Sequence, residues 1–340
     1  MIRLYNLFTF LICFFLFNIS NGQRPNTKKV EFKYVQPPSN PLPETVKTYH
    51  SSISVKTSLF TAPTNTRDNF GRLIELELKG YEQISSMGDA DILIGLTINN
   101  VSWESKVEKA KYKQKINDST YVDKEGGRYF IKASMNYSKT VKDVKNDKFL
   151  MSDVLTKSNG FTSNILPSYN QAIKERNNTL SYKRNNLYNQ LFLQAKNDFK
   201  YVINDVYGYP LKRLSQPIAR GKGRKHDYSD LQKAFDLFKN SSNNYNGHDI
   251  SEGLEKSILE CIKIWDMAIK QHVPKKRRAR IGDRIIGELY FNRAYAYFVL
   301  RDWNQVYSNL SKAKEFKGLK KVSKNLELIT NNLDKRYALQ

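Results

Sequence analysis

Few residues in this chain of 340 could carry acid–base, metal or thiol chemistry, and they are widely spaced. No two of the four histidines stand at the spacing of metal ligands, and no Gly-x-Ser-x-Gly segment marks a hydrolase nucleophile. The residues concerned are His50, His226, His248, His272, Cys13 and Cys261. They predict neither a metal site nor a bound cofactor.

Two further patterns contain residues that occur in catalytic sites. The basic segment RGKGRKH (220–226) lacks the glycine spacing and the final Ser or Thr of a phosphate-binding loop. The carboxylate pairs Asp89/Asp91 and Glu75/Glu77 are of a kind found in any chain of this length, and Asp91 more simply ends a turn before a strand. We therefore expect a protein that is not an enzyme.

The first residues have the pattern of a secretory signal. Arg3 precedes an almost unbroken apolar run, Leu4 to Phe17, which is followed by small and polar residues at 20–22. A membrane-spanning helix needs about 20 apolar residues, so a retained anchor is the less favoured alternative. We expect residues 1–22 to be removed, no transmembrane segment to remain, and the protein to be exported to the periplasm, the outer-membrane periphery or the exterior.

Cysteine usage limits how the exported chain is stabilised. Cys13 follows Ile12 and not the small residue that a lipidation signal needs, and it lies within the signal itself. After cleavage Cys261 is the remaining thiol, so no intramolecular disulfide can form. We expect Cys261 to be a small buried residue, and the fold to depend on its hydrophobic core.

The charge is strongly positive, with a formal net charge of +23. Residues 151–340 carry most of the excess, with 34 basic against 18 acidic groups. In an exported protein this predicts attraction to an anionic glycan, to lipopolysaccharide phosphates or to an acidic protein face, and no nucleic acid is expected. The alternative is a solvated basic surface. The candidate polyanion-binding residues are Lys222, Arg224, Lys225, Lys275, Lys276, Arg277, Arg278 and Arg280.

The order of elements predicts an α+β protein. Alternating or continuous apolar residues predict strands at 30–36, 46–55, 90–103, 128–144 and 144–150, with helices around 68–86 and 165–207. The polar stretch 104–127 reads as a connection that ends in a turn. We expect a mixed α/β domain with an antiparallel sheet (23–210), a basic linker (211–226) and an all-helical domain (227–340). The helix predicted at 165–207 should bury one face, formed by Tyr188, Phe192, Ala195, Phe199, Val202 and Val206.

The α/β part is similar in element order to small modules of curli-secretion and synthase-activator lipoproteins. The segment Ala90–Ile94, the stretch from Asp143 to Leu150 and the long helix follow one another as they do in those modules. This likeness implies a fold and carries no function with it.

The segment GELYFNRAYAYFVLRDWNQVYSNLSKAKEFKG, from residue 287, resembles the tetratricopeptide (TPR) repeat. Tyr290, Ala294, Tyr297, Trp303, Val306, Leu310 and Ala313 match its aromatic, small and large positions, whereas Arg293 and Gly318 depart from the pattern. A degenerate copy precedes it, with Cys261, Trp265 and Ala268 in its second helix. A last amphipathic stripe predicts a capping helix: Leu319, Val322, Leu326, Ile329 and Leu333. In its richness in Asn, Lys and Tyr, the chain resembles exported TPR proteins of Bacteroidota.

The resemblance implies a scaffold or adaptor that binds a protein or peptide on its concave face. On this sequence that face comprises Glu288, Phe291, Tyr295, Phe298 and Val299. The three aromatic residues lie at i, i+4 and i+7, so they form one strip on a helix. Two alternatives remain: the strip packs on the N-terminal part as core, or function resides in polyanion binding by the basic C-terminal half.

Overall fold

The computed structural model describes residues 26–56, 76–221, 226–276 and 279–340. The fold is α+β, as predicted. It divides into two compact units, which we call the sheet unit (38–209) and the helical unit (residues up to Pro37 with Pro210–Gln340). The predicted signal, 1–22, lies outside the described residues. None of the described helices has the length and apolar character needed to cross a membrane.

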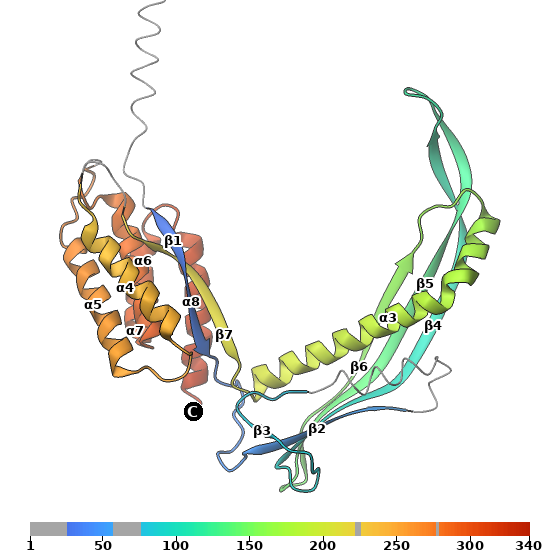
Figure 1. Ribbon diagram of the computed structural model, residues 1–340, viewed down its shortest axis with the longest axis horizontal. Coiled ribbons are helices and arrows are strands. Elements are labelled where there is room, and N and C mark those ends of the chain that lie inside the picture. Colours follow the sequence, from blue (N-terminus) through green and yellow to red (C-terminus); the bar gives the residue numbers. More distant parts are fainter. Residues whose placement is uncertain (1–25, 57–75, 222–225, 277–278) are drawn as a thin grey trace, which may run out of the picture. The chain divides into compact units, whose positions relative to one another are not determined.

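The sheet unit is built on a five-stranded sheet with the strand order β3-β2-β4-β5-β6. β2 runs parallel to β3 and to β4, whereas β4, β5 and β6 form an antiparallel meander. The sheet is therefore mixed, and its antiparallel part is the larger (Figure 1). The strands are β2 (Thr48–Val55), β3 (Glu82–Gln83), β4 (Ile92–Lys115), β5 (Tyr121–Asp143) and β6 (Lys148–Thr162).

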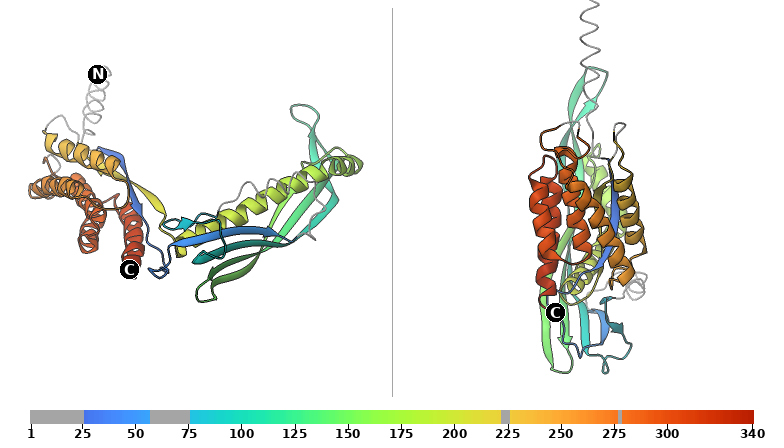
Figure 2. Two further views of the ribbon diagram at one scale, coloured as in Figure 1. Left: turned by 60° about the horizontal axis from the view of Figure 1, so that its bottom comes forward. Right: turned by 90° about the vertical axis from the view of Figure 1, so that its left-hand side faces the viewer.

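A long helix, α3 (Tyr169–Val206), lies along one face of this sheet (Figure 2). It begins at Ser168, whose side chain accepts a hydrogen bond from the Gln171 N–H at 3.2 Å and so caps the first turn. The predicted apolar stripe is its buried face up to Phe199, after which Ile203 takes the core position expected for Val202. Alternate apolar residues of β4 and β5 complete this core on the sheet side.

Two predictions for the sheet unit were wrong. No helix forms in the described part of the predicted segment 68–86, which contains Leu76, Leu78 and the short strand β3; residues 68–75 lie outside the described residues. The polar stretch 104–127 is not a connection, because β4 continues to Lys115 and β5 begins at Tyr121. Side chains at the tip of this long hairpin are exposed on both faces, so the apolar alternation that marks a strand is missing.

The helical unit combines five helices with a two-stranded ribbon. Each helix packs against the next one along the chain. β1 (Thr27–Val35) pairs antiparallel with β7 (Leu211–Ala219), so that Thr27 lies opposite Ala219. The helices are α4 (Ser229–Asn244), α5 (Glu252–Ile269), α6 (Asp283–Val299), α7 (Trp303–Lys314) and α8 (Lys320–Tyr337).

The ribbon corrects the predicted domain boundaries. Residues 211–219 of the predicted linker form strand β7, and the strand predicted at 30–36 is its partner β1. Both belong to the helical unit, which therefore includes residues far apart in the sequence. Val30, Phe32, Leu214 and Ile218 point from the ribbon into the core of the helices. These buried side chains stabilise the two-stranded ribbon, although it is not part of the larger sheet.

Candidate ligand-binding face

The predicted concave face of α6 is not an open surface. Phe291, Tyr295, Phe298 and Val299 are buried in the core of the helical unit, where α6 packs against strand β7. The Tyr295 hydroxyl donates to the Leu214 carbonyl at 2.7 Å, and the Phe298 ring lies edge-on to Tyr34. The prediction that this strip binds a partner is therefore wrong. The strip belongs to the core of the helical unit, beside the ribbon of that unit.

Glu288, the remaining residue of that predicted face, is largely buried. Burial raises the pKa of its carboxyl to about 7. Its Oε2 atom has no hydrogen-bond partner among the described residues. Burial of an ionised Glu288 carboxyl costs free energy of folding. We therefore regard Glu288 as a residue of the core and not as a ligand contact.

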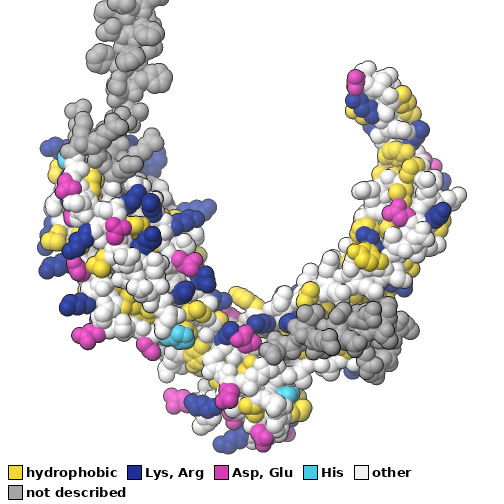
Figure 3. Space-filling view, viewed as in Figure 1, with side chains coloured by type: hydrophobic (Ala, Val, Ile, Leu, Met, Phe, Trp, Pro, Cys, Tyr) yellow, Lys and Arg dark blue, Asp and Glu magenta, His cyan; other side chains and the backbone are white. Residues whose placement is uncertain are grey.

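The predicted polyanion-binding residues do not form one described cluster. Lys222, Arg224, Lys225, Arg277 and Arg278 lie outside the described residues. Lys275 and Lys276 are exposed. Arg280 is engaged within the fold, because its guanidinium ion-pairs with Asp230 and donates to Gln271 Oε1 at 2.6 Å and to the Asp227 carbonyl at 2.8 Å. Lysine and arginine side chains on the helical unit are interspersed with acidic ones (Figure 3).

Thiol and imidazole groups do not assemble into a reactive site in the described part of the chain. Cys261 is buried, its thiol donates to the Ala234 carbonyl at 3.4 Å, and burial raises its pKa to about 12. His272 Nε2 lies 2.9 Å from Asp283 Oδ1 at the start of α6. Among the described residues, no three His, Cys, Asp or Glu side chains converge as a metal site would require.

A different surface has the character of a binding site: the face of the sheet opposite α3, here called the open face. Small polar side chains form a ladder across it from β2 to β6. Ser54 meets Thr97 at 2.9 Å, Asn99 donates to Ser138 at 2.6 Å, Asn136 donates to Thr156 at 3.2 Å, and Ser134 meets Ser158 at 2.6 Å. Such a face is rich in both hydrogen-bond donors and acceptors.

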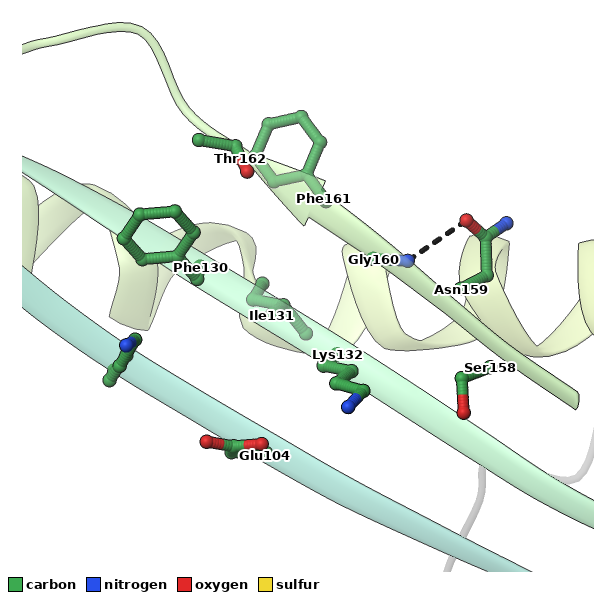
Figure 4. A pocket seen from close by; sticks show the side chains of 10 residues that line it. Glu104, Phe130, Ile131, Lys132, Ser158, Asn159, Gly160, Phe161 and Thr162 are labelled. Carbon is green, nitrogen blue, oxygen red and sulfur yellow. Dashed lines mark hydrogen bonds between the residues drawn. The ribbon is translucent and has the colours of Figure 1, made fainter.

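At one end of this ladder the open face has a hollow of about 520 Å³. Phe130 and Lys132 of β5, Glu104 of β4, and Ser158 and Thr162 of β6 line it (Figure 4). Gly160 lies opposite Lys132, and a Cβ atom there would meet no atom closer than the Ile131 carbonyl at 3.5 Å. The missing side chain therefore helps to form the hollow.

Cations surround the aromatic ring of this hollow. The Lys106 ammonium lies 5.3 Å and the Arg128 guanidinium 5.1 Å from the centroid of Phe130. Arg128 also forms an ion pair with Glu108 at 2.6 Å. Glu104 and Lys132 are cross-strand neighbours, but no salt bridge joins them. Both groups are available to a ligand.

The arrangement suits binding better than reaction. An aromatic ring offers an apolar surface for the carbon skeleton of a ligand, while hydroxyl, ammonium and carboxylate groups around it can pair with polar substituents. Sequence reasoning missed the site, although small polar residues alternate through KASMNYSKT (132–140). The proximity of Phe130 and Gly160 depends on the β5–β6 register, which the sequence does not display.

Comparisons with known proteins assign no family. No protein-family model and no curated protein matches the chain. A solved structure of a neuraminyllactose-binding hemagglutinin homologue from Helicobacter pylori is similar with 12% identity and a TM-score of 0.23; the match covers 48% of this chain and 92% of that one. A minor lipoprotein from Acinetobacter baumannii has 12% identity and a TM-score of 0.22, over 49% and 98%. These values leave the chain without a family, and its function must be argued from its own geometry.

Proposed function

We propose that this chain is a non-catalytic, exported envelope protein that binds an acidic glycan on the open face of its sheet unit. The observation that carries the proposal is the hollow at Phe130, where the Phe130 ring lies among three cations, two carboxylates and several hydroxyl groups. A sugar ring has apolar C–H faces and polar edges, and it needs this combination of partners.

The charges favour an acidic glycan over a neutral one. Lys106, Arg128 and Lys132 exceed Glu104 and Glu108 by one charge, and Glu108 is occupied by Arg128. No described carboxylate lies within ion-pairing distance of the Lys132 ammonium, so this group can bind a uronate or a phosphate. The net charge of +23 adds a long-range attraction for polyanions.

The ladder next to the hollow fits a polymer. From Phe130 to Thr140 a strand extends about 34 Å, at about 3.4 Å per residue. That length accommodates several sugar residues in a row, with the hollow as an anchor at one end. The secretory pattern of residues 1–22 would deliver the protein to a compartment rich in acidic polysaccharides.

The test uses the full chain and two matched probes with the same sugar backbone: polygalacturonate, which is charged, and its methyl ester, which is neutral. Binding measured by calorimetry should fall at least tenfold for Phe130→Ala with either probe, because the stacking surface is removed. Lys132→Ala should weaken polygalacturonate binding and leave the ester unaffected. Lys142→Ala is the control, because it removes the same charge from the same strand and face, away from the hollow.

Two results would contradict the proposal. Unchanged polygalacturonate binding by Phe130→Ala would show that the hollow is not the site. Equal losses for Lys132→Ala and Lys142→Ala would indicate attraction to a diffuse basic surface and not binding at the hollow.

An adaptor role for the helical unit is a second candidate, and it now depends on a surface other than α6. Leu328 of α8 is 68% exposed beside a hollow of about 210 Å³, which is lined by Tyr34, Gln36, Ile329, Asn332 and Leu333. An apolar side chain of a protein partner would fit there. Cross-linking with residue-level mapping in an envelope extract tests this, since Leu328→Asp should abolish the cross-link and Leu259→Asp, at an exposed leucine of α5, should retain it.

A further inference from the structure

Strand β6 forms one margin of the sheet and pairs with β5 alone among the described strands (Figure 1). It has 15 residues and contains no proline. An edge strand of this length presents a row of unpaired backbone groups, and soluble proteins normally protect such edges or use them. β6 also exposes two adjacent apolar side chains, Val154 at 65% and Leu155 at 38%.

The direction of the free backbone groups follows from the β5–β6 register. Ser163 N–H donates to the Tyr129 carbonyl at 3.0 Å, and this pair continues the register in which Phe161 lies opposite Ile131. Hydrogen-bonded pairs alternate in an antiparallel ladder, so odd-numbered residues of β6 bond to β5. Even-numbered residues, from Ser152 to Ser158, therefore direct their N–H and C=O groups away from the sheet.

We propose that β6 pairs antiparallel with β6 of a second copy of this chain, about a two-fold axis through Leu155. In this register Asp153 of each copy lies opposite Lys157 of the other, which gives two ion pairs. Leu155 lies opposite its own counterpart, and Val154 lies opposite Thr156. The outward-directed even residues then exchange hydrogen bonds, as the ladder requires.

Charge complementarity selects this register and this partner. If the axis moved to Val154, Asp153 would lie opposite Leu155 and Lys157 opposite Met151; if it moved to Thr156, Lys157 would lie opposite Leu155 and Asp153 opposite Asn159. Neither shift forms an ion pair. In an isologous contact the same surface of both copies is used, so each contact occurs twice. The two equivalent Asp153–Lys157 ion pairs fit this kind of contact.

The side chains that would meet across the axis, those of Asp153, Leu155 and Lys157, lie on the side of the sheet that carries α3. The helix lies mainly over β5, and the Lys157 ammonium forms an ion pair with Asp198 of α3. Tyr201, one helical turn beyond Asp198, is 64% exposed. Asp153 of the second copy would join the Lys157–Asp198 pair, while Leu155, its counterpart and Tyr201 would be covered.

The consequence is one continuous sheet formed from two five-stranded sheets. The open faces of both copies would then lie side by side. This inference stands independently of glycan binding, because the contacts involve the edge of β6 and not the hollow. A short strand pairing buries little area, so we expect a weak dimer that depends on concentration.

The test is sedimentation velocity of the full chain over a range of concentrations, with two charge-reversed variants. Asp153→Lys places an ammonium group opposite Lys157 on both sides of the axis, and Lys157→Glu places a carboxylate opposite Asp153. Each variant alone should be monomeric, because like charges then face each other. A mixture of the two variants should form a heterodimer, because only opposite charges then face each other. On one side of the axis the new ammonium group pairs with the new carboxylate. On the other side the original Asp153–Lys157 pair remains.

Val154→Pro provides a second, independent variant. Its lost N–H points away from β5, so the fold should be retained, while one outward hydrogen bond from each copy is removed and dimerisation falls. Circular dichroism and thermal melting confirm that each variant is folded. A monomeric unchanged protein at every concentration, a dimeric Asp153→Lys variant, or a mixture of folded variants that stays monomeric would each overturn the proposal.

Discussion

Asn292 of α6 binds both backbone groups of Ala219 in β7: its Nδ2 donates to the Ala219 carbonyl at 2.9 Å, and its Oδ1 accepts from the Ala219 N–H at 3.0 Å. Both residues are fully buried. An edge strand is thus fixed to a helix through its backbone, independently of the strand's side chains. The contact explains why the helical face predicted to bind a partner is already covered within this unit.

We predict that Asn292→Ala destabilises the helical unit by about 2–4 kcal/mol. The change leaves a backbone N–H and a carbonyl buried without partners, and each such group costs about 1–3 kcal/mol. Chemical denaturation should show a lower midpoint for the transition of this unit. Asn325→Ala, at an exposed position of α8, is the control and should alter stability by less than about 0.5 kcal/mol. Equal effects of the two changes would show that the amide contact contributes nothing.

A second prediction concerns Glu288 and pH. Burial raises the pKa of its carboxyl to about 7, above its unfolded value, so the folded state favours the protonated form. The resulting stability is fully present below about pH 4.3, the unfolded value, and is lost as the pH rises through about 7. The loss amounts to at most about 4 kcal/mol, because each pH unit between the two values contributes about 1.4 kcal/mol.

Glu288→Gln should remove this dependence. Thermal unfolding measured between pH 5 and pH 8 should show that the unchanged protein loses stability relative to the variant as pH rises. Glu315→Gln, at an exposed residue that follows α7, should follow the unchanged protein. A constant difference between Glu288→Gln and the unchanged protein at all pH values would contradict the prediction.

Local patterns in the sequence predicted local structure. The spacing of Tyr188, Phe192, Ala195 and Phe199 placed α3 and its buried face, and alternation placed the inner halves of β4 and β5. In each case one side of the element is buried and the other is exposed to solvent, and this difference gives a periodic pattern of apolar residues in the sequence.

Long-range pairing was not predictable in the same way. A strip such as Phe291, Tyr295 and Phe298 has the same appearance whether a partner or the chain itself covers it. The covering strand β7 lies within a segment whose lysines, arginines and glycines suggested a linker. Likewise, the hollow at Phe130 exists because Gly160 is brought close by strand register, and a one-residue shift would remove it.

The third prediction contrasts two glycines in helices. A Cβ atom on Gly287 of α6 would lie 2.6 Å from Phe316 Cβ, so Gly287→Ala should push α6 away from the α7–α8 connection and destabilise the protein by about 1–3 kcal/mol. Gly253 of α5 has no atom within 4 Å of that position, so Gly253→Ala should stabilise by about 0.5 kcal/mol through its better helix propensity. Denaturation midpoints should move in opposite directions. A shift of both midpoints in the same direction would exclude close helix packing at Gly287 as the cause.

The last prediction concerns Asp91, one member of the Asp89/Asp91 carboxylate pair, which accepts hydrogen bonds that hold the start of β2. Its Oδ2 accepts hydrogen bonds from the backbone N–H groups of Lys47 and Thr48, at 2.8 and 2.9 Å, where β2 begins. The Thr48 hydroxyl donates to the same oxygen at 3.0 Å and accepts from the Asp91 N–H. These hydrogen bonds, led by that of Lys47, hold the pKa of the carboxyl below its usual range.

Asp91→Ala should therefore destabilise the sheet unit by about 1–3 kcal/mol, and Asp91→Asn by less, because an amide oxygen can still accept. The contribution of the charge is present above the unfolded pKa of about 3.9 and is lost as pH falls through the lower folded value. The stability difference between the unchanged protein and Asp91→Asn should consequently shrink between pH 5 and pH 2.5. Asp89→Asn, at an exposed residue two positions earlier, should show no such change; if it did, the loss would reflect general charge repulsion in acid and not the anchoring of β2.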